Sequence, residues 1–263
     1  MDFNAIFSSE RDFPQWGLQG LDGAPARLFQ NINSTNRWLR EHASECVPGT
    51  LALANQQSAG RGRFDRVWCS PVGKNLYFSL LLAPSGVSVT QWPHLTQVAA
   101  ITLAQLYQDL GLEAHVKWPN DVLWNRHKMC GLLAERAQGA WGDALVLGIG
   151  INVNSEPADF ADLGRLAASL RIALGKPLNR EALLAEYLKR LASAFLCFAQ
   201  KGVAPWLEIW RTMPNFVGSK ARLVLVDKTL AGTIAGIRDD GSLWFLPDGA
   251  SEPLSVYSGD LEV

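Results

Sequence analysis

The sequence predicts an α+β fold that ends in a small all-β module, and three observations lead to this prediction. Strand-like runs and helix-like stretches are interspersed as far as residue 213. Short β-rich runs separated by turn-forming residues then follow Pro214. Apolar residues make up 48% of the 263 residues, enough for a sizeable core without disulfide bonds. We therefore expect two domains, at residues 1–213 and 214–263.

The first domain is expected to contain most of the strands and all of the helices. Residues 1–25 mix Gly, Pro and isolated aromatic residues, which predicts irregular or capping structure. Polar residues 33–36 offer N-caps for a helix over 37–42, and apolar spacing predicts a helix over 98–110 that stops at Gly111. Strands are predicted at 26–29, 50–54, 76–82, 115–118, 122–124, 129–135 and 144–153, and further helices at 163–170, 180–198 and 205–211.

The second domain is expected to be a meander of short strands. Asp227-Lys228 and Asp239-Asp240-Gly241 are turn sequences between them. The predicted strands lie at 221–226, 229–237, 242–246 and 254–256.

Bulk properties disfavour several classes of protein. The net charge of −1 leaves no global basic field for nucleic acid. The cysteines are scattered without a Cys-x-x-Cys pair, as expected of reduced thiols, and the histidines show no metal-ligand spacing. No apolar run reaches membrane-spanning length, and the acidic residues near the N-terminus argue against a signal peptide. We expect a cytoplasmic protein without a resident metal.

The strongest single motif is the sequence GRGRFDR over Gly60–Arg66. Its glycines let backbone approach a ligand closely, and Arg61, Arg63 and Arg66 carry forked donors that suit phosphate and carboxylate oxygens. It lacks the Gly-Lys-Ser/Thr ending of a P-loop and the third glycine of a dinucleotide fingerprint. Taken alone, such a motif is more often a flexible, solvated basic loop.

Four more motifs are weak singly. In KWPND (residues 117–121) and KMCGLL (128–133), a lysine at a strand can neutralise an anion, and we expect the two lysines on neighbouring strands. In GIGINVN (148–154), alternating glycines clear one face of a strand for a flat ring. STN (34–36) can contact a ligand or simply start a helix. Each motif also has a purely structural explanation as a turn, a surface lysine, tight packing or a cap.

Together, STN, QQSAGRGR, KWPND, KMCGLL and GIGINVN resemble, in order and spacing, the catalytic domain of the bacterial biotin–protein ligases. The resemblance runs from about Arg27 to the C-terminus. It implies a class II synthetase-like mixed sheet with helices on one side, followed by a small SH3-like β-barrel. It also implies a two-step reaction: biotin and Mg-ATP give biotinyl-5′-AMP and pyrophosphate, and a lysine of a biotin carrier domain then attacks the mixed anhydride.

The resemblance also assigns roles to single residues. The four cations Arg61, Arg63, Lys117 and Lys128 are implied to be catalytic, because they offset the repulsion between two anions. The biotin site is implied to comprise Ser34, Thr35, Asn36, Gln57, Arg61, Gly62, Arg63, Trp68, Lys128 and Gly131. The nucleotide site is implied to comprise Arg61, Arg63, Arg66, Lys117, Asn120 and Asn152. Neutral hydrogen-bonding groups at the biotin end suit an uncharged ureido ring.

Two features depart from the family pattern. Asp65 stands where members of the family usually carry Gly, and it sets an anion among three arginines, which can weaken or tune phosphate binding. Only 33 residues precede Ser34, too few for the winged-helix DNA-binding domain that some members carry. We therefore expect the monofunctional type, with no nucleic-acid or membrane partner, acting as a monomer or a homodimer.

Two alternatives remain at this stage. Lipoate–protein ligases share the catalytic fold, but they usually carry a Gly-Gly-Gly run near the arginine motif, which this sequence lacks. A non-catalytic biotin- or nucleotide-binding module is the other alternative. The intact Arg61, Arg63, Lys117 and Lys128 argue against it.

Overall fold

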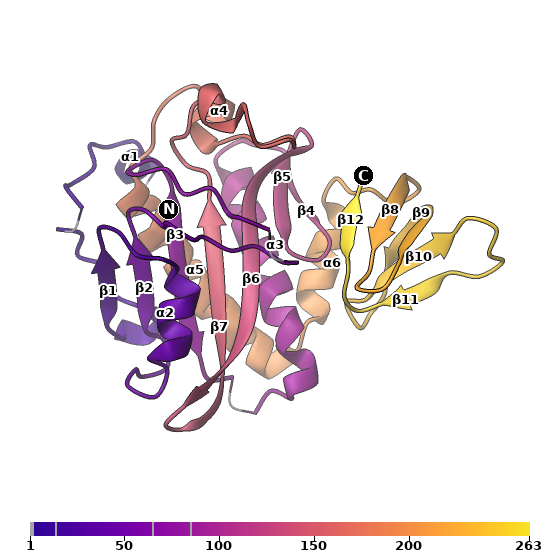
Figure 1. Cartoon of the computed structure of the whole chain (residues 1–263), viewed down its shortest axis with the longest axis horizontal. Coiled ribbons are helices and arrows are strands. Elements are labelled where there is room, and N and C mark those ends of the chain that lie inside the picture. Colours follow the sequence, from indigo (N-terminus) through magenta and orange to yellow (C-terminus); the bar gives the residue numbers. More distant parts are fainter. Residues whose placement is uncertain (1–2, 14, 65, 85) are drawn as a thin grey trace.

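The computed structural model describes residues 3–13, 15–64, 66–84 and 86–263. Within these ranges the chain forms a seven-stranded sheet with helices, followed by a separate five-stranded sheet (Figure 1). This arrangement confirms the predicted α+β fold and the all-β module at the C-terminus. Asp65 lies outside the described residues, so its predicted effect on the arginine loop stays a prediction.

The large sheet has the strand order β1-β2-β3-β7-β6-β5-β4. β1 pairs parallel with β2, and every other neighbouring pair is antiparallel, so the sheet is mixed as predicted. The strands are β1 (Ala26–Phe29), β2 (Leu51–Ala54), β3 (Leu76–Leu82), β4 (Ala114–Lys117), β5 (Asp121–Trp124), β6 (His127–Gly139) and β7 (Gly142–Ile151).

The long helices α3 (Trp92–Asp109) and α5 (Arg180–Lys201) cover one face of this sheet, and the short helix α2 (Thr35–Glu41) lies on the other (Figure 1). Side chains alternate across β3 accordingly: Leu80 belongs to the large core beneath α3 and α5, whereas Leu81 packs in a smaller cluster with Leu39 of α2. The prediction of helices on one side is thus confirmed for the long helices. The face that α2 covers only in part remains available for a site.

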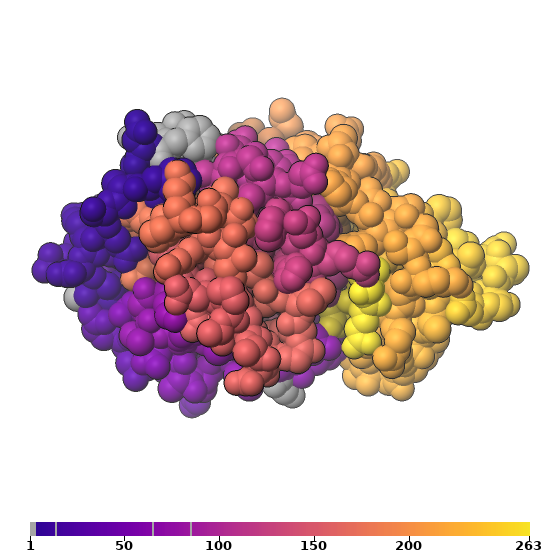
Figure 2. All heavy atoms as spheres, turned by 90° about the horizontal axis from the view of Figure 1, so that it is seen from above, coloured from indigo at the N-terminus to yellow at the C-terminus, as the bar shows by residue number. Residues whose placement is uncertain are grey.

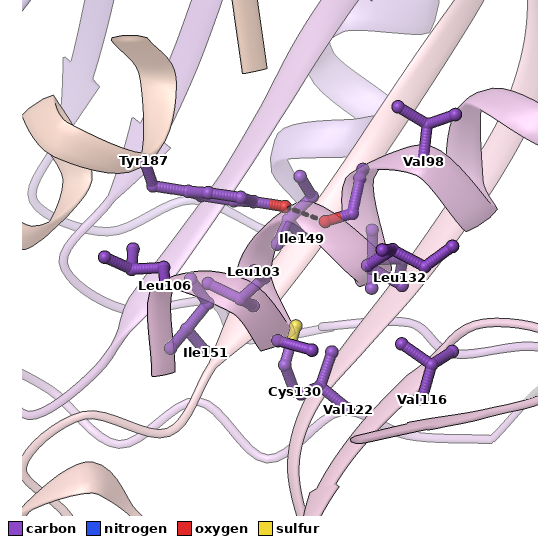
Figure 3. Close-up of a cluster of buried hydrophobic side chains, with 14 of the residues drawn as sticks. Val98, Leu103, Leu106, Val116, Val122, Cys130, Leu132, Ile149, Ile151 and Tyr187 are labelled. Atoms are coloured by element: carbon purple, nitrogen blue, oxygen red, sulfur yellow. Dashed lines mark hydrogen bonds between the residues drawn. The ribbon is translucent and has the colours of Figure 1, made fainter. Parts of the chain in front are cut away.

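The main core lies between the sheet and α3 and α5 (Figure 3). The Tyr187 hydroxyl of α5 donates to the Ala99 carbonyl of α3 at 2.8 Å, which satisfies a buried polar group. Burial raises the pKa of the Cys130 thiol well above its ordinary value, so this cysteine is a packing residue, as expected.

The second sheet has the order β11-β10-β9-β8-β12 and is antiparallel throughout. Helix α6 (Ala204–Thr212) leads into this second sheet. The last strand of the sheet returns to the part of the molecule that holds the large sheet, and the chain end is yellow in Figure 2. Its strands are β8 (Lys220–Val224), β9 (Thr229–Ile237), β10 (Leu243–Pro247), β11 (Leu254–Val256) and β12 (Asp260–Glu262). β12 was not among the strands predicted from the sequence.

One predicted element is wrong. Residues 163–170 do not form a helix; they run as turns and bends until α4 begins (Leu170–Leu174), with the Ser169 side chain as its N-cap. The backbone of this segment bonds to the start of β6 instead: Lys128 N donates to Leu166 O at 3.1 Å, and Ala168 N donates to Lys128 O at 3.1 Å. Tertiary pairing has therefore overridden a helical spacing of leucines.

The remaining short helices are α1 (Phe3–Ile6) and the 3-10 turns η1 (Leu21–Gly23), η2 (Val89–Gln91) and η3 (Pro157–Phe160). In the described part of the chain, no helix combines the length and apolar character that a membrane crossing needs.

Candidate active site

A pocket opens on the α2 face of the large sheet. Its rim is the start of α2 and the loop over residues 60–68, and its floor is β6 and β7. Predicted site residues that line it are Ser34, Thr35, Asn36, Gln57, Arg61, Gly62, Arg63, Arg66, Trp68, Asn120, Lys128 and Gly131. Five separate motifs therefore meet at one place. Lys117 and Asn152 are not among the lining residues.

Glycines form the floor because larger residues do not fit there. A Cβ atom on Gly148 would lie 2.1 Å from the Asn36 amide oxygen, and one on Gly150 would lie 2.4 Å from the Trp68 indole. Gly131 pairs directly with Gly150, and a Cβ there would lie 2.9 Å from the same indole. Over Gly131 and Gly150, the cleared face is occupied by the protein's own Trp68 indole. The Trp68 indole N–H is buried and finds no acceptor among the described residues.

The polar end of the pocket is a continuous hydrogen-bond network. Thr35 donates to the Gln57 amide oxygen through its backbone N–H at 2.9 Å and its hydroxyl at 3.1 Å. The Ser79 hydroxyl lies 2.7 Å from the Thr35 hydroxyl and 2.6 Å from the Asn36 amide oxygen. The Asn36 amide donates to Glu135 at 2.8 Å. Apart from Glu135, these groups are neutral donors and acceptors.

Three backbone hydrogen bonds between described residues close the arginine loop: Gly62 N to Arg66 O at 2.7 Å, Arg66 N to Arg63 O at 3.2 Å, and Trp68 N to Gly60 O at 2.9 Å. Its arginine side chains contact residues that are distant in the sequence. Arg63 donates to Gly259 O at 2.7 Å, and Arg66 forms an ion pair with Asp260.

At the other end of the loop, Arg61 forms an ion pair with Glu135 at 3.3 Å. Burial lowers the pKa of Arg63, although the charges of Asp260 and Asp121 oppose this shift. The loop is thus joined to the C-terminal strand at one end and to β6 at the other.

Lys128 and Lys117 share one buried carboxylate. Asp121 lies 2.6 Å from the Lys128 amine and 3.4 Å from the Lys117 amine. Burial alone would raise the pKa of Asp121, but the two lysines hold it below its ordinary value. The prediction of neighbouring strands is wrong, because β5, which carries Asp121, lies between β4 and β6. The neighbouring strands β4, β5 and β6 thus carry Lys117, Asp121 and Lys128, so the carboxylate lies between the two lysines.

Only Lys128 of this pair faces the pocket. Lys117 does not line the pocket, and its amine donates to Leu261 O at 2.9 Å. It contacts Asp121, which does line the pocket, and a contact between Lys117 and phosphate stays a prediction.

A second, smaller pocket adjoins the first and shares Trp68, Lys128 and Arg165 with it. Asn152 lines this second pocket, and its amide donates to Lys128 O at 3.2 Å and to Ala168 O at 3.1 Å. The predicted nucleotide residue thus lies on the far side of Lys128 from the polar end.

Some residues of the site were not in the predicted set: Arg165 and Asp260 line the pocket, and Ser79 and Glu135 hydrogen-bond to Asn36 in its wall. Glu135 and Ser79 follow from strand alternation once the register is known, but Asp260 comes from the last strand and belongs to no local motif.

In the part of the chain that the structure describes, no group of three or more His, Cys, Asp or Glu residues could hold a metal ion.

Comparison with known proteins identifies the family. The model of the biotin/lipoate A/B protein ligase family matches residues 28–152. The bifunctional ligase/repressor BirA of Escherichia coli (strain K12) is 34% identical over 243 residues, covering 90% of this chain and 74% of that protein. The chain belongs to the biotin/lipoate A/B protein ligase family.

Other relatives within this family are biotin ligases. The biotin–[acetyl-CoA-carboxylase] ligase of Paracoccus denitrificans is 30% identical, covering 82% of this chain and 92% of that protein. Among solved structures, the biotin protein ligase of Aquifex aeolicus in complex with biotin and ATP has a TM-score of 0.78 and 27% identity, covering 90% of this chain and 97% of that chain. The family match confirms the resemblance of the motifs and the fold class.

Proposed function

We propose that this protein is an ATP-dependent biotin–[acetyl-CoA-carboxylase] ligase. It activates biotin as biotinyl-5′-AMP and transfers the biotinyl group to a lysine of a biotin carrier protein or domain. The observation that carries this proposal is the convergence of a glycine floor, a neutral polar end and the cations Arg61, Arg63 and Lys128 in one pocket. ATP enters as its magnesium complex, a substrate, and no permanent cofactor is required.

The chemistry explains why cations surround the middle of the pocket. In the first step, a biotin carboxylate oxygen bonds to the α-phosphorus of ATP, and the bond to pyrophosphate breaks. Two anions must therefore meet, and fixed positive charges offset their repulsion and stabilise the developing charge. In the second step, the carrier amine bonds to the acyl carbon, AMP leaves with the bonding electron pair, and the amine loses a proton to solvent.

The geometry supports a division of labour along the pocket. Ser34, Thr35, Asn36 and Gln57 form a neutral end that suits the ureido ring, which needs donors and acceptors without a net charge. Lys128, at the boundary between the two pockets, is suited to the acyl-phosphate oxygens.

The loop and the second pocket complete this scheme. Arg61, Gly62, Arg63 and Arg66 would close over the adenylate, and Trp68 would cover its apolar part. Asn152 and Asn120 would support the nucleotide end, and Lys117 would contact phosphate.

We also propose that residues 1–213 form the catalytic domain and residues 214–263 a second, SH3-like domain. The end of α6 at Thr212, just before the five-stranded sheet, supports this boundary. The contacts of Arg63 with Gly259 O and of Arg66 with Asp260 support a contribution of this second domain to the site. The cytoplasmic location and the choice between monomer and homodimer stay predictions.

The decisive experiment separates the proposed activity from its alternatives. The protein is incubated with ATP and magnesium plus either biotin or lipoate, and the acyl-AMP product is identified by mass spectrometry. We expect biotinyl-AMP, and addition of an apo carrier domain should then yield a biotinylated lysine. Lipoyl-AMP as the preferred product would make the protein a lipoate ligase, and binding of biotin without any adenylate would make it a binding module.

A second assay tests the expectation of no nucleic-acid partner, which rests on a net charge of −1 without a global basic field. In a gel-shift experiment, we expect no specific shift of an operator fragment bound by a bifunctional ligase/repressor relative, with or without biotinyl-AMP. A specific, saturable shift would contradict this expectation.

A further inference from the structure

The segment at residues 8–13, the N-terminal clamp, precedes the region that matches the family model, and it is fixed to the start of α5. Two adjacent residues of the clamp form ion pairs with two adjacent residues at the start of α5. Glu10 accepts from the Arg180 guanidinium at 2.5 to 3.1 Å, and Arg11 donates to Glu181 at 2.9 Å. The Asn179 side chain, which caps α5, also donates to Ser9 O at 3.0 Å. Two neighbouring ion pairs therefore join the clamp to one helix end.

The two ion pairs differ in what lies behind them. Arg180 is only 5% exposed, and beyond Glu10 its guanidinium donates to Asn75 O at 3.2 Å and to the Asn55 side chain at 3.3 Å. Arg11, by contrast, keeps 59% of its side chain exposed. Among the described residues, Gly17 N is the only other group that hydrogen-bonds to the Glu181 side chain, and it belongs to the N-terminal region itself.

Asn75 continues the chain of contacts into the second pocket. Its amide oxygen accepts from Val153 N at 2.8 Å and from Ser155 N at 3.3 Å, and its amide nitrogen donates to the Ser155 hydroxyl at 2.8 Å. Asn75, Ser155 and Asn152 all line the second pocket, and neither Asn75 nor Ser155 lines the first. The contacts thus run from Glu10 through Arg180 and Asn75 to the wall beside Asn152.

We propose that Glu10 is a positioning residue for the nucleotide side of the site, acting through Arg180 and Asn75; this rests on the proposed ligase function. A buried guanidinium that loses its carboxylate must recruit other acceptors. The acceptors already in contact are the Asn75 carbonyl and the Asn55 amide oxygen. When a neutral residue replaces Glu10, Arg180 therefore shifts toward these two acceptors and displaces Asn75 in the wall of the second pocket. The polar end of the first pocket shares none of these contacts.

The test uses two matched variants of the full chain, Glu10→Gln and Arg11→Gln, which remove neighbouring charges from neighbouring ion pairs. For each, the dissociation constant of ATP is measured by titration calorimetry. The KM values for ATP and biotin and the kcat are then measured by pyrophosphate release. We expect Glu10→Gln to raise the ATP dissociation constant and KM by about three-fold or more, with the biotin KM and kcat unchanged. Arg11→Gln should leave all four values at the wild-type level.

Equal effects of the two variants, or equal effects on ATP and biotin, would overturn the proposal, because either result describes a clamp that only stabilises the fold. If Glu10→Gln fails to fold, Glu10→Asp keeps the charge but shortens its reach, and it should give the same ATP-selective change at smaller amplitude. Failure of the wild type to form biotinyl-AMP would refute the proposed function. The calorimetric comparison of ATP binding would still decide the role of Glu10.

Discussion

The floor and the arginine loop of the pocket are held in different ways. The floor belongs to β6 and β7, where Gly131 faces Gly150 and Leu133 faces Gly148 in an antiparallel ladder. Among its described residues, the loop at 60–68 has three backbone hydrogen bonds of its own, and the side chains of its arginines hold it further. Arg63 and Arg66 contact the C-terminal segment through Gly259 O and Asp260.

This difference teaches which part of the site a ligand can rearrange. Phosphate oxygens would compete with Gly259 O and Asp260 for the same arginine donors, so loop contacts can be exchanged on binding. Floor contacts are backbone hydrogen bonds and glycine clearances, which a ligand does not replace. We therefore expect the floor to fix the position of the fused ring of biotin, and the loop arginines to move with the phosphate.

The largest expected effect separates a floor cation from a loop cation. Lys128→Ala and Arg63→Ala should each slow adenylate formation about ten-fold or more, since a charge-assisted hydrogen bond contributes roughly 1.5–3 kcal/mol. Only Lys128→Ala should also destabilise the fold, by roughly 1–3 kcal/mol, because buried Asp121 loses the nearer of its two lysine partners and keeps Lys117. Pyrophosphate release and thermal unfolding measure the two quantities. Wild-type rates in both variants would contradict the assigned roles.

A smaller effect compares glycines of the two regions. Gly148→Ala should lower the melting temperature by roughly 2 °C or more, because its Cβ would lie 2.1 Å from Asn36, which is held by Ser79 and Glu135. Gly62→Ala in the loop meets nothing closer than 3.4 Å and should unfold close to wild type. Calorimetry of both variants measures the difference. Equal losses would remove the distinction between a tightly packed floor and an adaptable loop.

The link between the loop and the C-terminal strand can be broken directly. Asp260→Asn removes the carboxylate that pairs with Arg66 and lies 3.9 Å from the Lys117 amine. Trypsin should then cleave at the loop arginines about three-fold faster or more in the absence of ligands. Asp248→Asn is the control, because its ion pair with Lys220 is exposed and belongs to the second sheet alone. Identical cleavage of both variants and wild type would show that Asp260 does not hold the loop.

The smallest effect concerns pH. The pKa of Asp121 in the folded protein lies below its ordinary value of 3.8, so ionised Asp121 stabilises the fold above that pH. The contribution is lost as pH falls through the folded-state pKa, because the unfolded chain binds the proton first. Between about pH 5 and pH 3 the unfolding free energy should therefore fall less steeply for Asp121→Asn than for wild type. Denaturant titrations across this range give the slopes, and parallel slopes would contradict the shift.

The sequence predicts the floor better than the walls. Alternating glycines in residues 148–150 indicate a cleared strand face from local spacing alone, and the structure has that face. The relation of Lys117 to Lys128 required the strand order, which places β5 between them. The helix expected at 163–170 failed because the backbone there pairs with Lys128 instead. Asp260 could not be found, since a single acid in a terminal strand carries no local signal.

The most direct test of the account is a crystal structure of the protein with biotinyl-5′-AMP. We expect the fused ring of biotin beside Asn36 and the Gly148 end of the floor. The phosphate should be contacted by Lys128 and by Arg63, which will have exchanged Gly259 O for phosphate oxygen. A ligand bound away from the glycine floor, or Arg63 still on Gly259 O without touching the adenylate, would contradict it.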